Sequence, residues 1–114
     1  MSAKAKGARR ERQVRDFLRK LGYRVTRSGA SLGEWDLIGF CDFDAAVLVQ
    51  IKSNRPPRPA ERKRMEEFPA LLTRKLYVVI LDRNRSWDWR LWDPVSKAWI
   101  VYHPKHLAER LSDG

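Results

Sequence analysis

The chain reads WDLIGFCDFDAAVLVQIK from Trp35 to Lys52. Its runs over 35–40 and 45–51 are rich in the apolar residues typical of strands, and residues 41–44 between them suit a turn. The segment therefore predicts two neighbouring strands joined as a β-hairpin, around which the rest of the chain can be arranged.

Polar side chains end the second strand of this hairpin. Gln50 and Lys52 are two residues apart and share one face, while Val49 and Ile51 face the core. An amide and a lysine at the end of an apolar strand cost free energy unless something binds them. If the two strands pair, Asp36 can lie beside both. Such a group suits phosphodiester hydrolysis, because carboxylate and carbonyl oxygens hold Mg²⁺ and a lysine stabilises charge on the phosphate.

Helices and further strands are expected on both sides of the hairpin. Apolar residues within 8–21 recur at helical spacing, and Gly22 ends that helix. Pro59 opens a second helix, whose apolar face extends from Met65 to Leu72. Further strands are expected over 23–27, 76–81, 87–93 and 99–102, and a last helix over 104–111.

The resulting order, αβββαβββα, predicts an α/β fold with a mixed central β-sheet flanked by helices. A length of 114 residues fits one domain, expected over residues 8–114 behind a flexible basic arm over residues 1–7. No apolar run approaches the roughly 20 residues that span a bilayer, and no secretory signal is expected. Cys41 is the only cysteine, which excludes an intrachain disulfide and fits a reducing, cytoplasmic setting.

Charge is distributed unevenly along the chain. The 24 Lys and Arg against 14 Asp and Glu give a net charge of +10, which favours a polyanionic partner such as nucleic acid. Residues 1–27 carry +8 and residues 52–75 carry +5, but residues 28–51 carry −4 and contain no Lys or Arg. This pattern suits a nuclease, in which basic surfaces hold phosphates and an acidic pocket holds metal. A pair of buried strands joined by an acidic turn explains it equally well.

Three stretches together resemble a nuclease superfamily. Asp36, followed after thirteen residues by Gln50–Lys52 (QIK), resembles the PD-(D/E)XK signature in its less common QXK form. Lys6–Arg12 (KGARRER) and Arg27–Ser31 (RSGAS) are similar to the first helix and the arginine-and-serine loop of archaeal-type or phage-type Holliday junction resolvases. These matches span residues 6–53.

The resemblance implies a restriction-endonuclease-like fold and a structure-selective DNA endonuclease that resolves four-way (Holliday) junctions by paired symmetric nicks, as a homodimer. It implies Mg²⁺ as the cofactor, with Mn²⁺ as a substitute. The metal ligands would be Glu11, Asp36 and Gln50. Lys52 would act on the water and the phosphate, with Ser31 in support. The candidate phosphate contacts are Arg9, Arg10, Arg12, Arg27, Arg55, Arg58 and Arg62.

Two residues depart from the usual pattern of these nucleases. Trp35 stands where many relatives have proline, a structural position at which the change costs little. Gln50 stands where the strand usually carries glutamate, which removes one negative charge from the metal site. An amide oxygen still ligates Mg²⁺, but with lower affinity unless another carboxylate helps. Glu34 lies two residues before Asp36, hence on the same face of the expected strand, and is the candidate for that help.

Several alternatives stay open at this level. Glu11 can instead be a carboxylate that favours the first turn of its helix. Another PD-(D/E)XK nuclease, acting on flaps or of the restriction type, would use the same residues, and a non-catalytic basic nucleic-acid-binding protein would need none of them. The tryptophans within 87–93 suit either a core or a surface for self-association or base stacking.

Overall fold

The computed structural model describes residues 3–28, 33–41, 44–69 and 73–104. The helices are α1 (Ala3–Lys20) and α2 (Pro59–Glu67), and the strands are β1 (Arg24–Arg27), β2 (Leu37–Cys41), β3 (Asp44–Ser53), β4 (Arg74–Ile80), β5 (Trp87–Asp93) and β6 (Ala98–Val101). The expected mixed α/β fold is confirmed, with six strands in one sheet.

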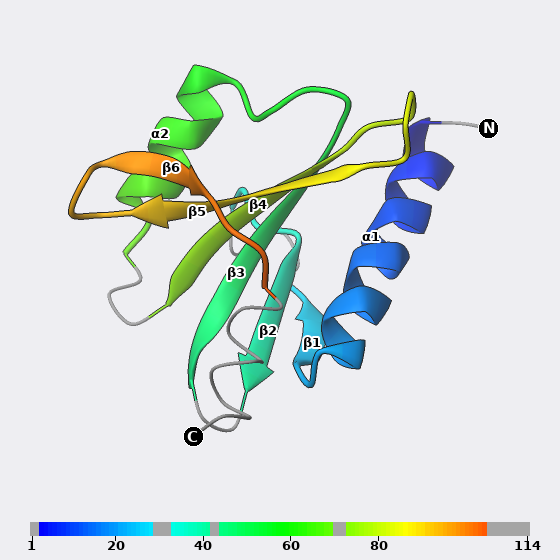
Figure 1. Ribbon diagram of the computed structural model, residues 1–114, viewed down its shortest axis with the longest axis horizontal. Coiled ribbons are helices and arrows are strands. Elements are labelled where there is room, and N and C mark those ends of the chain that lie inside the picture. Colours follow the sequence, from blue (N-terminus) through cyan, green and yellow to red (C-terminus); the bar gives the residue numbers. More distant parts are fainter. Residues whose placement is uncertain (1–2, 29–32, 42–43, 70–72, 105–114) are drawn as a thin grey trace.

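The strands lie in the sheet in the order of the chain, from β1 to β6 (Figure 1). Neighbouring strands are antiparallel except β3 and β4, which are parallel. A parallel pair needs a crossover connection, and the segment that contains α2 supplies it. β4 is an apolar run that is buried along almost its whole length, as expected for a strand covered on both faces.

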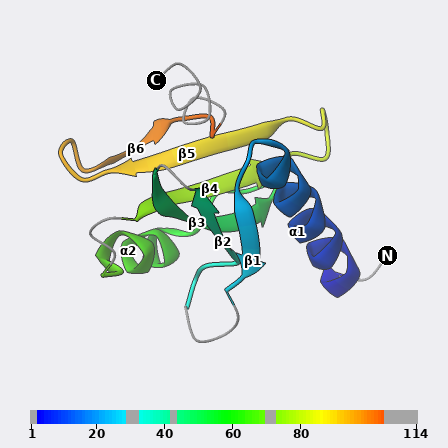
Figure 2. The same cartoon turned by 90° about the horizontal axis from the view of Figure 1, so that it is seen from below.

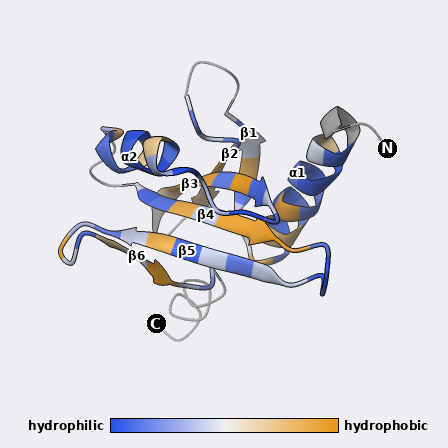
Figure 3. Cartoon of the chain, turned by 90° about the horizontal axis from the view of Figure 1, so that it is seen from above, coloured by the Kyte–Doolittle hydropathy of each residue, from blue (hydrophilic) through white to orange (hydrophobic). Residues whose placement is uncertain are grey.

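The two helices cover opposite faces of the sheet. Leu18 of α1 packs in one apolar cluster with Leu76 of β4, and Met65 of α2 packs in another with Tyr77 of β4. Successive residues of a strand point to opposite faces, so these clusters lie on the two sides of β4. Figure 2 shows α1 and α2 well apart beside the sheet, and Figure 3 shows apolar residues concentrated along β4 while α2 is largely hydrophilic.

The first helix begins earlier than the sequence predicted. Ala3–Gly7 were expected in a flexible basic arm, but α1 continues without a break from Ala3 to Lys20. Alanine and lysine are strong helix formers, and Lys6 Nζ lies 2.6 Å from Asp82 Oδ2. The helix therefore begins five residues before the expected Ala8, because a basic composition does not prevent helix formation.

The second helix ends sooner than its apolar pattern suggested. Phe68 follows α2 with an extended backbone (ψ 127°), because Pro69 disfavours the helical conformation in the residue before it. Residues 71–72 and 105–111, expected to be helical, lie outside the described part of the chain. No helix within the described residues is both long and apolar enough to cross a membrane.

The tryptophans of β5 mostly serve the interior. Trp87 and Trp89 lie against Phe17 of α1, with ring centroids 5.4 and 5.8 Å away, and only 3% of Trp89 is exposed. Trp92, on the other face, packs against Trp99 of β6. The core interpretation of this strand is confirmed for Trp89 and supported by the partners of the other two.

Candidate active site

The start of β2 lies beside the second half of β3, where Leu37 pairs with Val49. Asp36 directly precedes β2 instead of lying inside it as expected, but its N–H still donates to the Val49 carbonyl at 2.9 Å. The Ile51 N–H in turn donates to Asp36 Oδ2 at 2.7 Å. The carboxylate is therefore held against the part of β3 that carries Gln50 and Lys52, as the sequence predicted.

The arginine-and-serine loop supports Asp36 through Ser28. The Ser28 N–H donates to the Asp36 carbonyl at 3.1 Å, and Ser28 Oγ donates to the Trp35 carbonyl. These bonds hold the backbone on which the Asp36 side chain is mounted. Ser31, the serine expected to assist the site, lies outside the described residues.

Gln50 and Lys52 both contact a carboxylate of α2. Lys52 Nζ lies 2.6 Å from Glu61 Oε2, and Gln50 Nε2 donates to the same oxygen at 3.3 Å. Gln50 is only 5% exposed. Among the described residues, its other polar atom, Oε1, has no hydrogen-bond partner although it is buried.

Glu61 is a site residue that reasoning from the sequence missed. It lies in the first turn of α2, one helical turn before Met65, which is buried against the sheet. Residues four apart share a helix face, so the i, i+4 spacing from Met65 was the signal that Glu61 also faces β3. The hydrogen bond from Lys52 lowers the pKa of the Glu61 carboxyl, which is therefore ionised at neutral pH.

Glu11 reaches the same region from α1. The helix begins at Ala3, so Glu11 lies beyond its first turn, where the helix dipole no longer explains a carboxylate. Glu11 Oε1 lies 2.5 Å from Arg27 Nε. Arg27 is opposite Leu37 in the β1–β2 pairing, one residue from Asp36. This ion pair therefore ties α1 to the strands at the candidate site.

The pKa of the Asp36 carboxyl depends on the charges of the other candidate residues. Burial raises its pKa above the ordinary value, and the carboxylates of Glu11 and Glu34 raise it further, while the Ile51 N–H and the Lys52 ammonium act in the opposite direction. A carboxyl in such surroundings gains from a nearby cation, because a positive charge stabilises its ionised form.

Glu34 does not take the position expected of it. Because β2 begins at Leu37, Glu34 lies in the preceding turn, and the expectation that it shares a strand face with Asp36 is wrong. Its Oε1 accepts a hydrogen bond from Arg64 Nε of α2 at 2.6 Å. Glu34 therefore links the loop to α2, and its charge reaches Asp36 only as a small contribution.

The donor atoms of this site fit a divalent cation through oxygen ligands. Within the described residues, no three His, Cys, Asp or Glu side chains gather as a metal cluster. Among the described residues, the buried Gln50 Oε1 has no hydrogen-bond partner, and the Ile51 N–H binds the Oδ2 oxygen of Asp36. Carboxylate and amide oxygens are the ligands that Mg²⁺ takes.

Most of the expected phosphate contacts are accessible. The exposed ones are Arg9, Arg12, Arg27, Arg55 and Arg58. Arg62 is partly buried and lines a cavity of about 480 Å³ together with Asn54 and Tyr77. The exposed side chains come from α1, β1 and the segment leading into α2.

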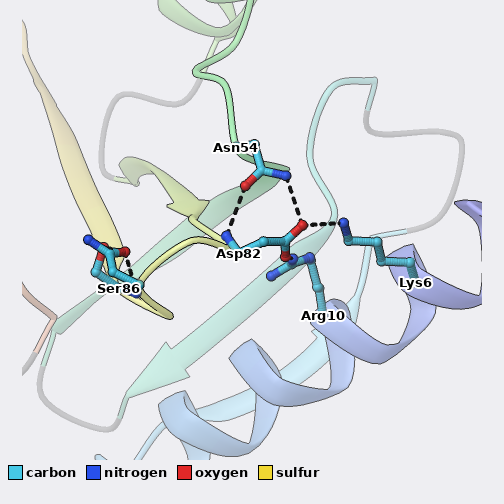
Figure 4. A network of polar contacts seen from close by, with 6 residues as sticks. Lys6, Arg10, Asn54, Asp82 and Ser86 are labelled. Carbon is cyan, nitrogen blue, oxygen red and sulfur yellow. Dashed lines mark hydrogen bonds and ion pairs between the residues drawn. The ribbon is translucent and has the colours of Figure 1, made fainter.

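Arg10 is the buried member of the expected phosphate contacts, and its charge is paired within the fold. It is 8% exposed and pairs with Asp82 after β4. Figure 4 shows Lys6 and Arg10 of α1 and Asn54, which follows β3, converging on this carboxylate. Asn54 Nδ2 donates to Asp82 Oδ2 at 3.0 Å, and the Asp82 N–H donates to Asn54 Oδ1 at 2.8 Å. The cluster joins α1 to the ends of β3 and β4.

A search of solved structures finds a protein with a similar fold. The fold is similar to the 1.6 Å structure of Archaeoglobus fulgidus Hjc, a Holliday junction resolvase from an archaeal hyperthermophile. The TM-score is 0.56 and the identity 16%, over 89% of this chain and 98% of that one. No curated protein sequence matches the chain significantly.

The family comparison covers the whole candidate site. Residues 2–68 match the model of the archaeal Holliday junction resolvase (Hjc) family. This range is more than half of the chain, and it contains Glu11, Asp36, Gln50, Lys52 and Glu61. The chain therefore belongs to the archaeal Holliday junction resolvase family and is an endonuclease of the junction-resolving class.

Proposed function

We infer that this resolvase cuts four-way DNA junctions with Mg²⁺ held by Glu11, Asp36 and Gln50, and that Mn²⁺ can substitute. The observation that carries this proposal is the buried Gln50 Oε1, which has no hydrogen-bond partner among the described residues and lies on the strand that binds Asp36. A buried carbonyl oxygen without a partner is costly. A cation ligand at this atom would recover that cost.

The side chains divide the chemical work between them. A bound divalent cation would polarise the scissile phosphate and lower the pKa of a water molecule. Asp36 keeps one oxygen for the cation while Oδ2 accepts the Ile51 N–H. Lys52 supplies a positive charge for the phosphate as its negative charge increases, and the contact with Glu61 holds that ammonium in place.

The basic side chains around the site would bind the DNA backbone. Arg9, Arg12, Arg55 and Arg58 are exposed, and phosphate contacts supply affinity without reading sequence. A four-way junction exposes four strands of backbone at one place, so a broad basic surface suits it. Ser31 would support the site from the arginine-and-serine loop, in which Ser28 already holds the Asp36 backbone.

Paired symmetric nicks require two active sites. A four-way junction has two-fold symmetry, and a homodimer with the same symmetry would present one site to each of two opposed strands. We therefore infer that the working form is a homodimer. The lone Cys41 is compatible with a reducing compartment such as the cytoplasm.

The deciding experiment is cleavage of a synthetic four-way junction, with linear duplex and flap DNA as controls, in Mg²⁺ or in EDTA. Wild type and Lys52→Ala are compared. Paired symmetric nicks confined to the junction, dependent on Mg²⁺ and lost in Lys52→Ala, are the expected result. Equal cutting of flaps or duplex would move the function to a broader nuclease. Tight binding without cleavage in any divalent metal would favour a binding protein.

A further inference from the structure

We propose that Glu61 is a positioning residue that replaces the charge missing at Gln50: it turns the Gln50 amide so that Oε1 faces the metal, and it holds Lys52 beside it. This inference rests on the proposed function. In this proposal, the third acidic group of the site belongs to α2 and not to β3.

The hydrogen bonds determine which way the Gln50 amide points. Glu61 Oε2 lies 3.3 Å from Gln50 Nε2 and 2.6 Å from Lys52 Nζ. A carboxylate only accepts hydrogen bonds, so it selects the NH₂ end of the amide. The reversed amide would bring two oxygens together at this distance. Glu61 therefore leaves Oε1, and not Nε2, as the atom available to a cation.

The orientation of the Gln50 amide matters because the side chain is buried. Gln50 is nearly fully buried, so water cannot freely satisfy either end of the amide. Oε1 has no hydrogen-bond partner within the described part of the chain. An NH₂ group in its place would repel a cation, whereas a carbonyl oxygen binds one. The choice between metal-binding and metal-repelling forms of the site thus depends on Glu61.

Charge also favours this assignment. Asp36 and Glu11 supply two carboxylates, and glutamate at position 50 would have supplied a third on β3. Glu61 of α2 supplies a third negative charge instead, and its carboxylate is in direct contact with the Gln50 amide. The same carboxylate is the counter-ion that holds the Lys52 ammonium beside the amide, with Lys52 Nζ 2.6 Å from Glu61 Oε2.

Glu61 has a second role, which the test must separate from the first. It is the third residue of α2 after the N-cap Arg58, and its carboxylate interacts with the Arg58 backbone N–H. This is the carboxylate half of a capping box, and glutamine can take the same position. Glu61→Gln therefore keeps the cap and the side-chain shape while it removes the charge and the constraint on the amide.

The test measures Mg²⁺ affinity by calorimetry and Mn²⁺ affinity by electron paramagnetic resonance, without DNA. Loss of a residue that orients a metal ligand typically weakens affinity by about 10-fold to 100-fold, and we expect this for Glu61→Gln. The matched control is Glu66→Gln on the same helix, where the carboxylate accepts a hydrogen bond from Trp99 Nε1 at 2.8 Å. It loses the same charge and should bind metal as wild type does.

Exchanging glutamine and glutamate between positions 50 and 61 gives a more specific test of the same proposal. Gln50→Glu alone places two carboxylates in contact, whereas Gln50→Glu with Glu61→Gln returns one carboxylate and one amide that donates to it. The double variant should recover metal affinity to about the wild-type level, so the two substitutions should be strongly non-additive. Wild-type affinity in Glu61→Gln, or a double variant no better than Glu61→Gln, overturns the proposal.

The wild-type protein offers a test that needs no variant. The chain contains only two glutamines, Gln13 and Gln50, so their side-chain amide signals in nitrogen-15 NMR are easily assigned. The Gln50 signals should exchange slowly with water and shift on addition of Mg²⁺, while those of the exposed Gln13 should do neither. A Gln50 amide that behaves like Gln13 overturns the proposal.

The outcomes distinguish this inference from the function on which it rests. A wild-type protein that cuts junctions in Mg²⁺, with a Glu61→Gln variant of unchanged metal affinity, disproves the role of Glu61 alone. A wild-type protein that binds no Mg²⁺ and cuts no junction disproves the proposed function and this inference together.

Discussion

The backbone N–H of Ile51 donates a hydrogen bond to Asp36 Oδ2 at 2.7 Å, just beyond the point where Leu37 of β2 pairs with Val49 of β3. This bond fixes a carboxylate that burial would otherwise disfavour. The bond uses only the Oδ2 oxygen of Asp36, and in the proposed function the second oxygen would bind the cation.

Asp36→Asn should therefore separate folding from activity. The asparagine carbonyl can still accept the Ile51 N–H, so the melting temperature should change little. The loss of a charged metal ligand should remove several kcal/mol of transition-state stabilisation. Junction cleavage should therefore slow by at least about 100-fold. Single-turnover cleavage and a thermal melt measure the two effects. A variant that cuts at the wild-type rate would show that Asp36 is not a ligand.

Arg55→Ala and Arg58→Ala should weaken junction binding without changing the chemical step. Both side chains are exposed beside the start of α2. For each lost phosphate contact, the slope of log affinity against log salt should fall by about 0.9 on duplex arms. Lys97→Ala, in the exposed turn between β5 and β6, is the matched control and should leave the slope unchanged. An unchanged slope in the arginine variants would remove them from the DNA surface.

The Asp82 cluster should make stability sensitive to acid. The hydrogen bond from Lys6, then that from Asn54 and the charge of Arg10, lower the pKa of Asp82 from 3.8 to about 2. A depressed pKa stabilises the folded state above the unfolded value of 3.8, and this contribution is lost as the pH falls towards 2. Asp82→Asn should therefore be less stable than wild type at neutral pH.

Denaturant titrations of both proteins at several pH values provide the measurement. The difference between wild type and Asp82→Asn should shrink between about pH 4 and pH 2. A difference that stays constant over this range would show that the ion pairs with Lys6 and Arg10 do not contribute to folding.

Two glycine substitutions should have opposite effects on stability. A Cβ at Gly39 of β2 would lie 2.8 Å from Val47 Cγ2, and Val47 is fully buried, so neither strand can easily move. Gly39→Ala should cost about 1–3 kcal/mol. Among the described residues, nothing lies within 4 Å of a Cβ at Gly7 in α1, and Gly7→Ala should stabilise the protein by about 0.4–1 kcal/mol.

Urea titration of the two alanine variants checks this pair. Equal effects of Gly39→Ala and Gly7→Ala would contradict the close approach of β2 and β3. The comparison matters for function as well, because the same pairing holds Asp36 beside β3.

Much of the site was accessible from local patterns. Alternation along β3 placed Gln50 and Lys52 on one face, and a hairpin between 35–40 and 45–51 predicted that Asp36 lies beside them. Both inferences rest on strand geometry, which repeats every two residues and needs no knowledge of the rest of the chain. The strand boundary at Leu37 was less accessible, because Asp36 keeps a ladder hydrogen bond outside the strand.

Two expectations about charged residues failed, one made from composition and one from strand spacing. The basic residues at 1–7 indicated a flexible arm, but from Ala3 they belong to a helix. Lys6 of this helix forms an ion pair with Asp82, which follows β4. Glu34 was expected to share a strand face with Asp36, but it lies in a turn and pairs with Arg64. In both cases the partner is distant in sequence, and composition contains no information about it.

The sequence by itself determined the α/β class, the hairpin, and the residue types that identify a nuclease, because periodicity and spacing are local properties. Only the tertiary structure decided that Gln50 contacts Glu61, eleven residues away, and that Arg10 pairs with Asp82, seventy-two residues away. Such contacts depend on how the connections bring helices onto the sheet. The free energy of that packing is shared by the whole core, and no single stretch of sequence contains it.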